Sequence, residues 1–234
     1  MKAVILAGGL GTRLRPLTYV MPKAMLPVGN KPILEHTIEF LKRKGIHDII
    51  LATGYLGRFI EEYFKDGSAW GVSLTYKLAR PLGTAGQLKT ASDELSETFL
   101  AMNGDILIDV DVESMRKQHR VSKALVTVAV REFQYQLKYG ILDFADDNVV
   151  QKWNEKPTKS SWMNVGLYIM EPRILDMIPS ESVCSLEYDI FPKVIESGPY
   201  LLTFKSDTSY MDIGDLASLD AANQETREED FEVR

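Results

Sequence analysis

The N-terminal stretch constrains the fold most, because an uninterrupted apolar segment leads directly into a glycine-rich turn. Residues Ala3–Ala7 carry no polar side chain. Such a segment is typical of a strand that is buried on both faces of a parallel sheet covered by helices. Gly8, Gly9 and Gly11 follow at once, and residues without a Cβ atom let the backbone turn sharply and bring its N–H groups close to an anion. The stretch therefore predicts an α/β sheet with a phosphate-binding loop at the end of its first strand.

Two arginines follow these glycines and support the phosphate interpretation. Arg13 and Arg15 carry planar guanidinium groups that suit phosphate oxygens. A P-loop would need Lys and then Ser or Thr after its last glycine, and the chain has no lysine at that position. A dinucleotide fingerprint would need a small residue where Leu14 stands. Both standard nucleotide motifs are excluded, while a tight turn beside surface arginines remains the simpler alternative.

Composition excludes several classes of partner. The net charge of -6 over 234 residues argues against a nucleic-acid-binding surface, where a basic stripe is expected. No apolar run approaches the length of a membrane span, so we expect no membrane partner. The single cysteine, Cys184, excludes an internal disulfide and fits a reducing cytoplasm. The sequence leaves the oligomeric state open, a homo-oligomer included.

Apolar segments and helical patterns alternate through the first half of the chain. This alternation predicts right-handed crossover units and a Rossmann-like, mostly parallel central sheet flanked by helices. The second half is richer in strands, with a hairpin about residues 146–148. We expect a single domain over residues 1–234. It comprises a nucleotide-binding lobe at about 1–130, a smaller β-rich lobe at about 131–215, and a C-terminal helix and tail at 216–234.

Short motifs along the chain resemble those of one enzyme family. Residues 8–18 (GGLGTRLRPLT) and 22–27 (PKAMLP) are similar to the signature of the sugar-1-phosphate nucleotidyltransferases, the NDP-sugar pyrophosphorylases. The likeness continues, in family order, through PLGTAG, NGD, YG, EKP, NVG and MDIG at residues 81–86, 103–105, 139–140, 155–157, 164–166 and 211–214. The residues of the PLGTAG motif are most similar to those of mannose-1-phosphate guanylyltransferases.

The resemblance implies a reaction between a sugar 1-phosphate and an NTP that gives an NDP-sugar and pyrophosphate. The motif style favours GTP and mannose 1-phosphate. Leu78 and Arg80 depart from the residues that many relatives carry near the base, so thymidylyl or uridylyl transfer to glucose 1-phosphate stays open. Transfer to another phosphorylated alcohol also stays open. From another class, a non-catalytic regulator that binds a nucleotide sugar is a further alternative.

The resemblance also assigns roles to individual residues. Arg13, Lys23 and Asp105 match catalytic positions, with Arg13 at the leaving phosphates and Lys23 between the α-phosphate and the incoming sugar phosphate. Asp105 and Asp212 match the ligands of Mg²⁺, whose preference is for oxygen donors. Asp109 and Asp215, the nearby alternatives, are expected to cap helices instead. The matched nucleotide-binding positions are Leu6, Ala7, Gly8, Gly9, Gly11, Thr12, Arg13, Gly83 and Thr84, and the matched sugar-side positions are Lys23, Gly140, Glu155, Lys156 and Asn164.

Overall fold

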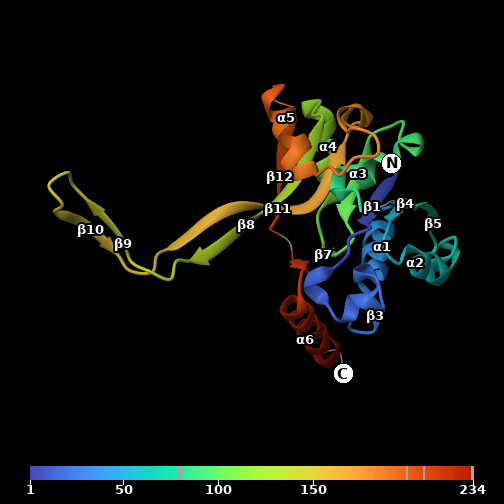
Figure 1. The fold of residues 1–234 in the computed structure, drawn as a ribbon, viewed down its shortest axis with the longest axis horizontal. Coiled ribbons are helices and arrows are strands. Elements are labelled where there is room, and N and C mark those ends of the chain that lie inside the picture. The colour runs from blue at the N-terminus through green and yellow to red at the C-terminus, as the bar shows by residue number, and fades with distance from the viewer. Residues whose placement is uncertain (79–80, 199, 208, 233–234) are drawn as a thin grey trace.

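A computed structural model describes residues 1–78, 81–198, 200–207 and 209–232 of the chain, without the side chains of 227–232. Its core is a seven-stranded sheet in the order β12-β8-β11-β6-β1-β4-β5. Neighbouring strands run parallel except at β11, which is antiparallel to both β8 and β6. The expected mostly parallel α/β sheet is thus confirmed (Figure 1). The strands are β1 (Ala3–Ala7), β4 (Asp48–Thr53), β5 (Ser73–Leu78), β6 (Phe99–Asn103), β8 (Val126–Gln136), β11 (Thr158–Met170) and β12 (Leu201–Lys205).

Helices cover both faces of this sheet. Alternate residues of β1 enter two separate apolar cores, because successive side chains of a strand point to opposite faces. Ala3, Ile5 and Ala7 join one core, and Val4 and Leu6 join the other. Burial on both faces explains why the strand carries no polar side chain. The first core includes side chains of α1 (Ile33–Arg43), α2 (Gly57–Phe64) and α4 (Val112–Ser122), and the second includes side chains of α3 (Gly83–Lys89) and α5 (Phe191–Glu196).

Small elements complete the body of the molecule. The strands β7 (Ile106–Ile108) and β13 (Tyr210–Asp212) pair antiparallel beside the central sheet, and β2 (Pro27–Val28) pairs with β3 (Lys31–Pro32). The last helix, α6 (Leu216–Glu232), occupies most of the segment in which a C-terminal helix and tail were expected. In the part of the chain that the structure describes, none of the helices combines the length and apolar character that crossing a membrane requires.

Two strands of the sheet continue far beyond it and form a long two-stranded arm, residues 131–163. The outer halves of β8 and β11 pair with each other alone, and β9 (Ile141–Phe144) and β10 (Val150–Asn154) form the hairpin at its tip. Figure 1 shows the arm projecting clear of the body. The expected lobe boundary near residue 130 falls within β8, and residues 131–215 contribute both to the arm and to the central sheet.

His119 is a buried titratable group that joins α4 to the sheet. Its side chain is 2% exposed, with Nδ1 2.8 Å from Thr127 Oγ1 and Nε2 3.2 Å from Glu171 Oε1. Burial lowers the pKa of His119 below its usual 6.5, although Glu171 acts in the opposite direction. The imidazole is therefore neutral in the folded protein at neutral pH.

Acidification should destabilise the fold through His119. The unfolded chain takes up a proton on this histidine below about pH 6.5, while the folded state resists protonation until a lower pH. The contribution of neutral His119 to the free energy of unfolding is present above about pH 6.5 and is lost as the pH falls. In urea unfolding, His119→Gln should show a smaller loss of stability than the wild type between pH 7 and pH 5. The exposed His47→Gln serves as the control, and an unchanged pH dependence in His119→Gln would contradict the assignment.

Candidate functional site

Two neighbouring parallel strands bring the glycine loop and Asp105 to the same edge of the sheet. Leu6 of β1 lies opposite Asn103 of β6, and Gly104 N donates to Leu6 O at 3.0 Å. Open α/β sheets bind their ligands at the carboxyl ends of the strands, which is where Asp105 lies. A pocket of about 150 Å³ opens here, lined by Leu6, Ala7, Gly9, Lys23, Ala24, Thr84, Gln87, Asn103, Gly104 and Asp105.

The three loop glycines differ in their surroundings. Gly11 has φ 58°, and a Cβ atom there would lie 2.8 Å from Thr18 Cγ2. Gly8 donates its N–H to Gln87 Oε1 at 2.8 Å, and a Cβ atom at Gly8 would lie 2.7 Å from the same oxygen. Gly9 has no heavy atom within 4 Å of its Cβ position. Gly9 therefore offers the open backbone surface in this loop, whereas Gly8 and Gly11 shape it.

The cationic side chains of the site lie close to its carboxylates. Lys23 Nζ is 2.5 Å from Asp105 Oδ2. A Cβ atom on Gly214 would lie 3.3 Å from both Arg13 Nη2 and Asp212 Oδ2, so the Arg13 guanidinium and the Asp212 carboxylate face the same point. Thr12 and Arg13 are exposed in the short 3-10 turn that follows Gly11. Arg15, the second arginine of the motif, lies over the Tyr19 ring at 5.0 Å instead.

Asp105 and Asp212 are brought together by the small sheet. Asp212 of β13 pairs with Ile106 of β7, and Ile213 N donates to Asp105 O at 3.0 Å. Loss of contact with water raises the pKa of Asp212, the Asp105 charge raises it further, and Lys23 and Arg13 oppose the rise. Two neighbouring carboxylates in mutual repulsion form an oxygen-donor set that suits Mg²⁺. Within the described residues no three His, Cys, Asp or Glu side chains form a metal cluster, so phosphate and water oxygens would have to supply further ligands.

Of the two alternative carboxylates, Asp109 and Asp215, only Asp215 caps a helix as expected. Asp215 caps α6 as expected, because its Oδ1 accepts from Ser218 N at 2.9 Å. Asp109 does not cap α4, and this expectation was wrong. Asp111 accepts from Ser114 N instead, since the helix begins two residues later than the pattern suggested. Asp109 pairs with Lys44 at 2.6 Å.

A hydrogen-bond network around Glu187 connects two expected site residues. Thr84 Oγ1 and Ser185 Oγ donate to Glu187 Oε2 at 2.8 and 2.7 Å, and Tyr168 OH donates to Oε1 at 3.1 Å. Asn164 Nδ2 in turn donates to Tyr168 OH at 2.7 Å. The network links the nucleotide-side Thr84 to the sugar-side Asn164 through a carboxylate that the sequence did not single out.

Gly83 closes this part of the site by a tight backbone contact. It has φ 72°, and a Cβ atom there would lie 2.5 Å from Cys184 O. The same carbonyl accepts from Ala85 N at 3.0 Å and Gly86 N at 3.2 Å. Cys184 is buried, and burial raises the pKa of its thiol, which makes it a poor nucleophile.

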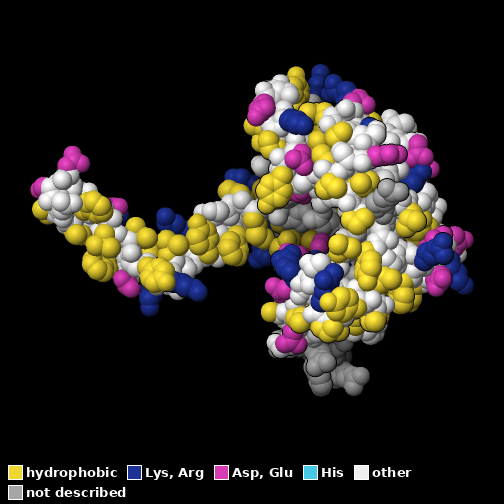
Figure 2. Space-filling model, in the orientation of Figure 1, with side chains coloured by type: hydrophobic (Ala, Val, Ile, Leu, Met, Phe, Trp, Pro, Cys, Tyr) yellow, Lys and Arg dark blue, Asp and Glu magenta, His cyan; other side chains and the backbone are white. Residues whose placement is uncertain are grey.

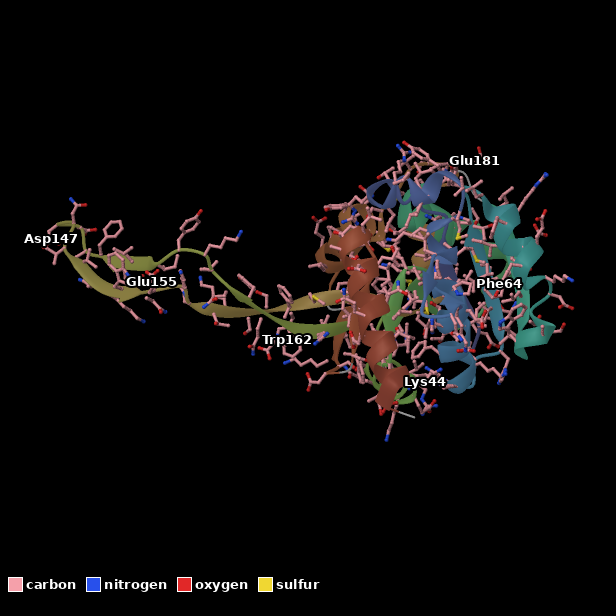
Figure 3. All side chains as sticks on the ribbon, turned by 90° about the horizontal axis from the view of Figure 1, so that it is seen from below. Lys44, Phe64, Asp147, Glu155, Trp162 and Glu181 are labelled. Carbon is pink, nitrogen blue, oxygen red and sulfur yellow. The ribbon has the colours of Figure 1, made fainter. Side chains whose placement is uncertain are left out.

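The remaining sugar-side residues lie on the arm. Glu155 Oε2 accepts from Trp153 Nε1 at 3.1 Å, and a Cβ atom on Gly140 would lie 2.6 Å from that carboxylate oxygen. Lys156 follows with φ 45°, and its carbonyl accepts from Gln136 Nε2 at 3.2 Å. The structure thus brings Gly140, Glu155 and Lys156 together as one group. Figure 3 places Glu155 beyond Trp162, away from the body that holds the pocket.

Two residues around the pocket, Gln87 and Glu187, were not predicted from the sequence. Only Gln87 lies next to a motif that could have indicated it. Gln87 directly follows the PLGTAG motif at residues 81–86, and its side chain is buried against Gly8. Glu187 reaches Thr84 across 103 positions of sequence, so no spacing rule could have found it. A larger cavity of about 570 Å³, lined by His36, Arg43 and Arg131 among others, contains none of the expected site residues and is not the site.

Comparison with known proteins agrees with this architecture. The family model for nucleotidyl transferases matches residues 2–229, so the chain belongs to the nucleotidyl transferase family. It is similar to a UTP–glucose-1-phosphate uridylyltransferase of Synechocystis sp., 35% identical over 233 residues, covering 92% of this chain and 60% of the relative. It is also similar to the mannose-1-phosphate guanyltransferase of Saccharomyces cerevisiae. The two are 34% identical over 223 residues, and the match covers 92% of this chain and 61% of the relative. The chain therefore spans about 60% of the length of these curated relatives.

A solved structure supports the fold over nearly the whole chain. The putative glucose-1-phosphate thymidylyltransferase from Bacillus anthracis superposes with a TM-score of 0.77 at 27% identity, covering 97% of this chain and 95% of that one. The family resemblance inferred from the motifs is thereby confirmed.

Loss of the Glu187 carboxylate should affect both stability and nucleotide binding. Glu187→Ala leaves the Thr84, Tyr168 and Ser185 hydroxyls without this acceptor, which should cost about 1–3 kcal/mol of unfolding free energy. Glu187→Gln keeps one acceptor oxygen and should lose less. Chemical denaturation and NTP binding titrations measure the two effects. The exposed Glu196→Ala is the control, and equal behaviour of the two alanine variants would contradict the proposed role of the network.

Proposed function

We propose that the chain transfers a nucleotidyl group from an NTP to a sugar 1-phosphate, releasing pyrophosphate and an NDP-sugar. The observation that carries this proposal is the convergence of Lys23, Arg13, Asp105 and Asp212 beside the open Gly9 backbone. Cations and an oxygen-donor pair next to a phosphate-binding loop suit phosphoryl chemistry, in which positioning and charge neutralisation supply most of the rate. Family membership supports the same reaction class.

The mechanism follows from the position of each charge. A phosphate oxygen of the sugar 1-phosphate attacks the α-phosphorus in line with the departing pyrophosphate, and no covalent enzyme intermediate is needed. Arg13, exposed on the loop, neutralises charge on the leaving phosphates. Lys23 is held by Asp105 where it can approach both the α-phosphate and the attacking group. Asp105 and Asp212 would hold Mg²⁺, which when bound offsets charge on the triphosphate.

The substrates we favour are GTP and mannose 1-phosphate. The PLGTAG motif at residues 81–86 supports this choice, as does the similarity to a mannose-1-phosphate guanyltransferase. The similar proteins nevertheless include uridylyl, guanyl and thymidylyl transferases. Leu78, one of two residues that depart from the family near the base, is 70% exposed, and Arg80, the other, lies outside the described residues. The base and the sugar therefore need direct measurement.

A substrate panel tests the proposal. The protein should release pyrophosphate with Mg²⁺, one nucleotide of a panel of ATP, GTP, CTP, UTP and dTTP, and one member of a set of hexose 1-phosphates, with the highest kcat/KM for GTP and mannose 1-phosphate. Preference for UTP or dTTP with glucose 1-phosphate would overturn the choice of substrates but keep the reaction. Binding of nucleotide sugars without any turnover would favour the non-catalytic regulator instead.

Substitutions in the charged cluster separate chemistry from folding. Arg13→Ala and Asp105→Asn should each lower kcat by about 10²–10³, because each removes a charge that acts on the transferring phosphates. Their melting temperatures should stay near that of the wild type, since both side chains are partly or fully exposed. Arg116→Ala on α4, where the arginine lies 3.8 Å from Glu113, is the matched control. Near-normal turnover in Arg13→Ala or Asp105→Asn would remove that residue from the mechanism.

A further inference from the structure

The tip of the arm is an amphipathic hairpin with an uncovered apolar face. Leu142 pairs with Trp153 and Phe144 with Val150, and residues directly opposite each other in a β-ladder share a face. Asp143 pairs with Lys152 on the opposite face. Phe144 and Trp153 are each 65% exposed. Figure 2 shows hydrophobic side chains along much of the arm, so one face of the tip is built to be covered.

A two-stranded ribbon of this kind is at most marginally stable alone in water. The arm carries ten of the 23 large exposed hydrophobic side chains in the described part of the chain. Its outer strands also present unpaired edges, which natural proteins cover or protect. Exposed apolar side chains and open strand edges of this kind are suited to contact with a protein surface.

The ladder of the arm directs it away from its own body. Arg131 to Gln136 pair without interruption with Met163 to Thr158. At roughly 3.3 Å per residue, the nine steps along the chain from Asn164 to Glu155 span up to about 30 Å. The register shift of β11 lies between Asn164 and Tyr168, where the ribbon joins the sheet. The ribbon leads away from the body in both views (Figures 1 and 3), so Glu155 could reach its own pocket only if the ribbon bent back, whereas a second copy could receive it with the pairing unchanged.

The arm and the body carry complementary halves of one site. The body holds Lys23, Asp105 and the open glycine loop, which suit phosphates. The arm holds Glu155 fixed by Trp153 over Gly140, followed by Lys156, a carboxylate and a cation that suit sugar hydroxyls and a phosphate. Neither half is complete by itself.

We propose that two copies of the chain exchange arms, so that the Gly140, Glu155 and Lys156 group of one copy completes the pocket of the other. Such reciprocal exchange generates a two-fold dimer from the contacts of a single chain. The apolar face of Leu142, Phe144, Val150 and Trp153 is then covered by the receiving copy. The inference rests on the proposed function, because it assigns the sugar side of that same site to the arm.

Mixed dimers test the exchange. Chains with different affinity tags are co-expressed, and dimers that contain one of each are isolated by two successive purifications. The first mixed dimer pairs an Arg13→Ala chain with a Glu155→Ala chain. Under exchange the intact body of the second chain receives the intact arm of the first, so about half of the wild-type turnover per dimer returns. If each arm serves its own body, neither site is complete and no activity returns.

The second mixed dimer reverses the expectation. It pairs an Arg13→Ala/Glu155→Ala chain with a wild-type chain. Exchange leaves each site with one defective half and predicts no turnover, whereas arms that serve their own bodies leave one intact site. Activity in the second dimer but not in the first overturns the exchange. Full activity of the homogeneous Glu155→Ala protein would also overturn it, because the arm would not belong to the site.

Assembly gives a readout that does not depend on turnover. Sedimentation should show a dimer for the wild type and a shift to monomer for Leu142→Ser/Phe144→Ser, with unchanged far-ultraviolet circular dichroism of the body. Asp143→Asn/Lys152→Gln on the opposite face of the hairpin is the matched control and should remain dimeric. A monomeric wild type, or a dimer unaffected by the serine variant, overturns the exchange. A dimeric wild type that is sensitive to the serine variant but releases no pyrophosphate would refute the proposed function and leave the exchange standing.

Discussion

The pairing of β1 with β6 is the constraint on which the site depends. It fixes Leu6 opposite Asn103, so the glycine loop and Asp105 leave the sheet at the same level. Gly104 makes this possible, because a Cβ atom there would lie 3.0 Å from Leu6 O. Both strands are buried on both faces, so the register is held by two cores at once. A one-residue slip would turn the apolar side chains to the wrong core and separate the loop from the carboxylate.

The charges at this edge of the sheet oppose one another. Asp105 and Asp212 repel each other, which contributes to the raised pKa of Asp212. Lys23, only slightly exposed, and Arg13 offset that repulsion. A carboxylate pair that needs cations nearby is also well matched to a triphosphate that arrives with a divalent ion.

Local patterns in the sequence predicted the parallel sheet and the glycine loop that follows its first strand, because a strand buried on both faces carries only apolar residues, as β1 does. The network around Glu187 could not be predicted, since it joins residues far apart in the chain. The arm was predicted only in part. The turn about Asn148 and its flanking strands were expected, and Asn148 does adopt φ 64°. The pairing of β8 with β11 beyond the sheet is a long-range property, and nothing in the local pattern distinguishes an extended ribbon from a folded lobe.

The distribution of tryptophan gives the molecule a built-in optical label. Trp153 and Trp162 lie on the arm, whereas Trp70, the third of the chain's three tryptophans, packs against Phe64 of the body at a ring distance of 4.8 Å. Both arm indoles are largely exposed, and Lys205 Nζ lies 4.3 Å from the centre of the Trp162 ring. Emission from the protein therefore combines two environments that differ in their contact with water. Any event that covers the arm changes mainly the more red-shifted part of that emission, without a dye or a mutation.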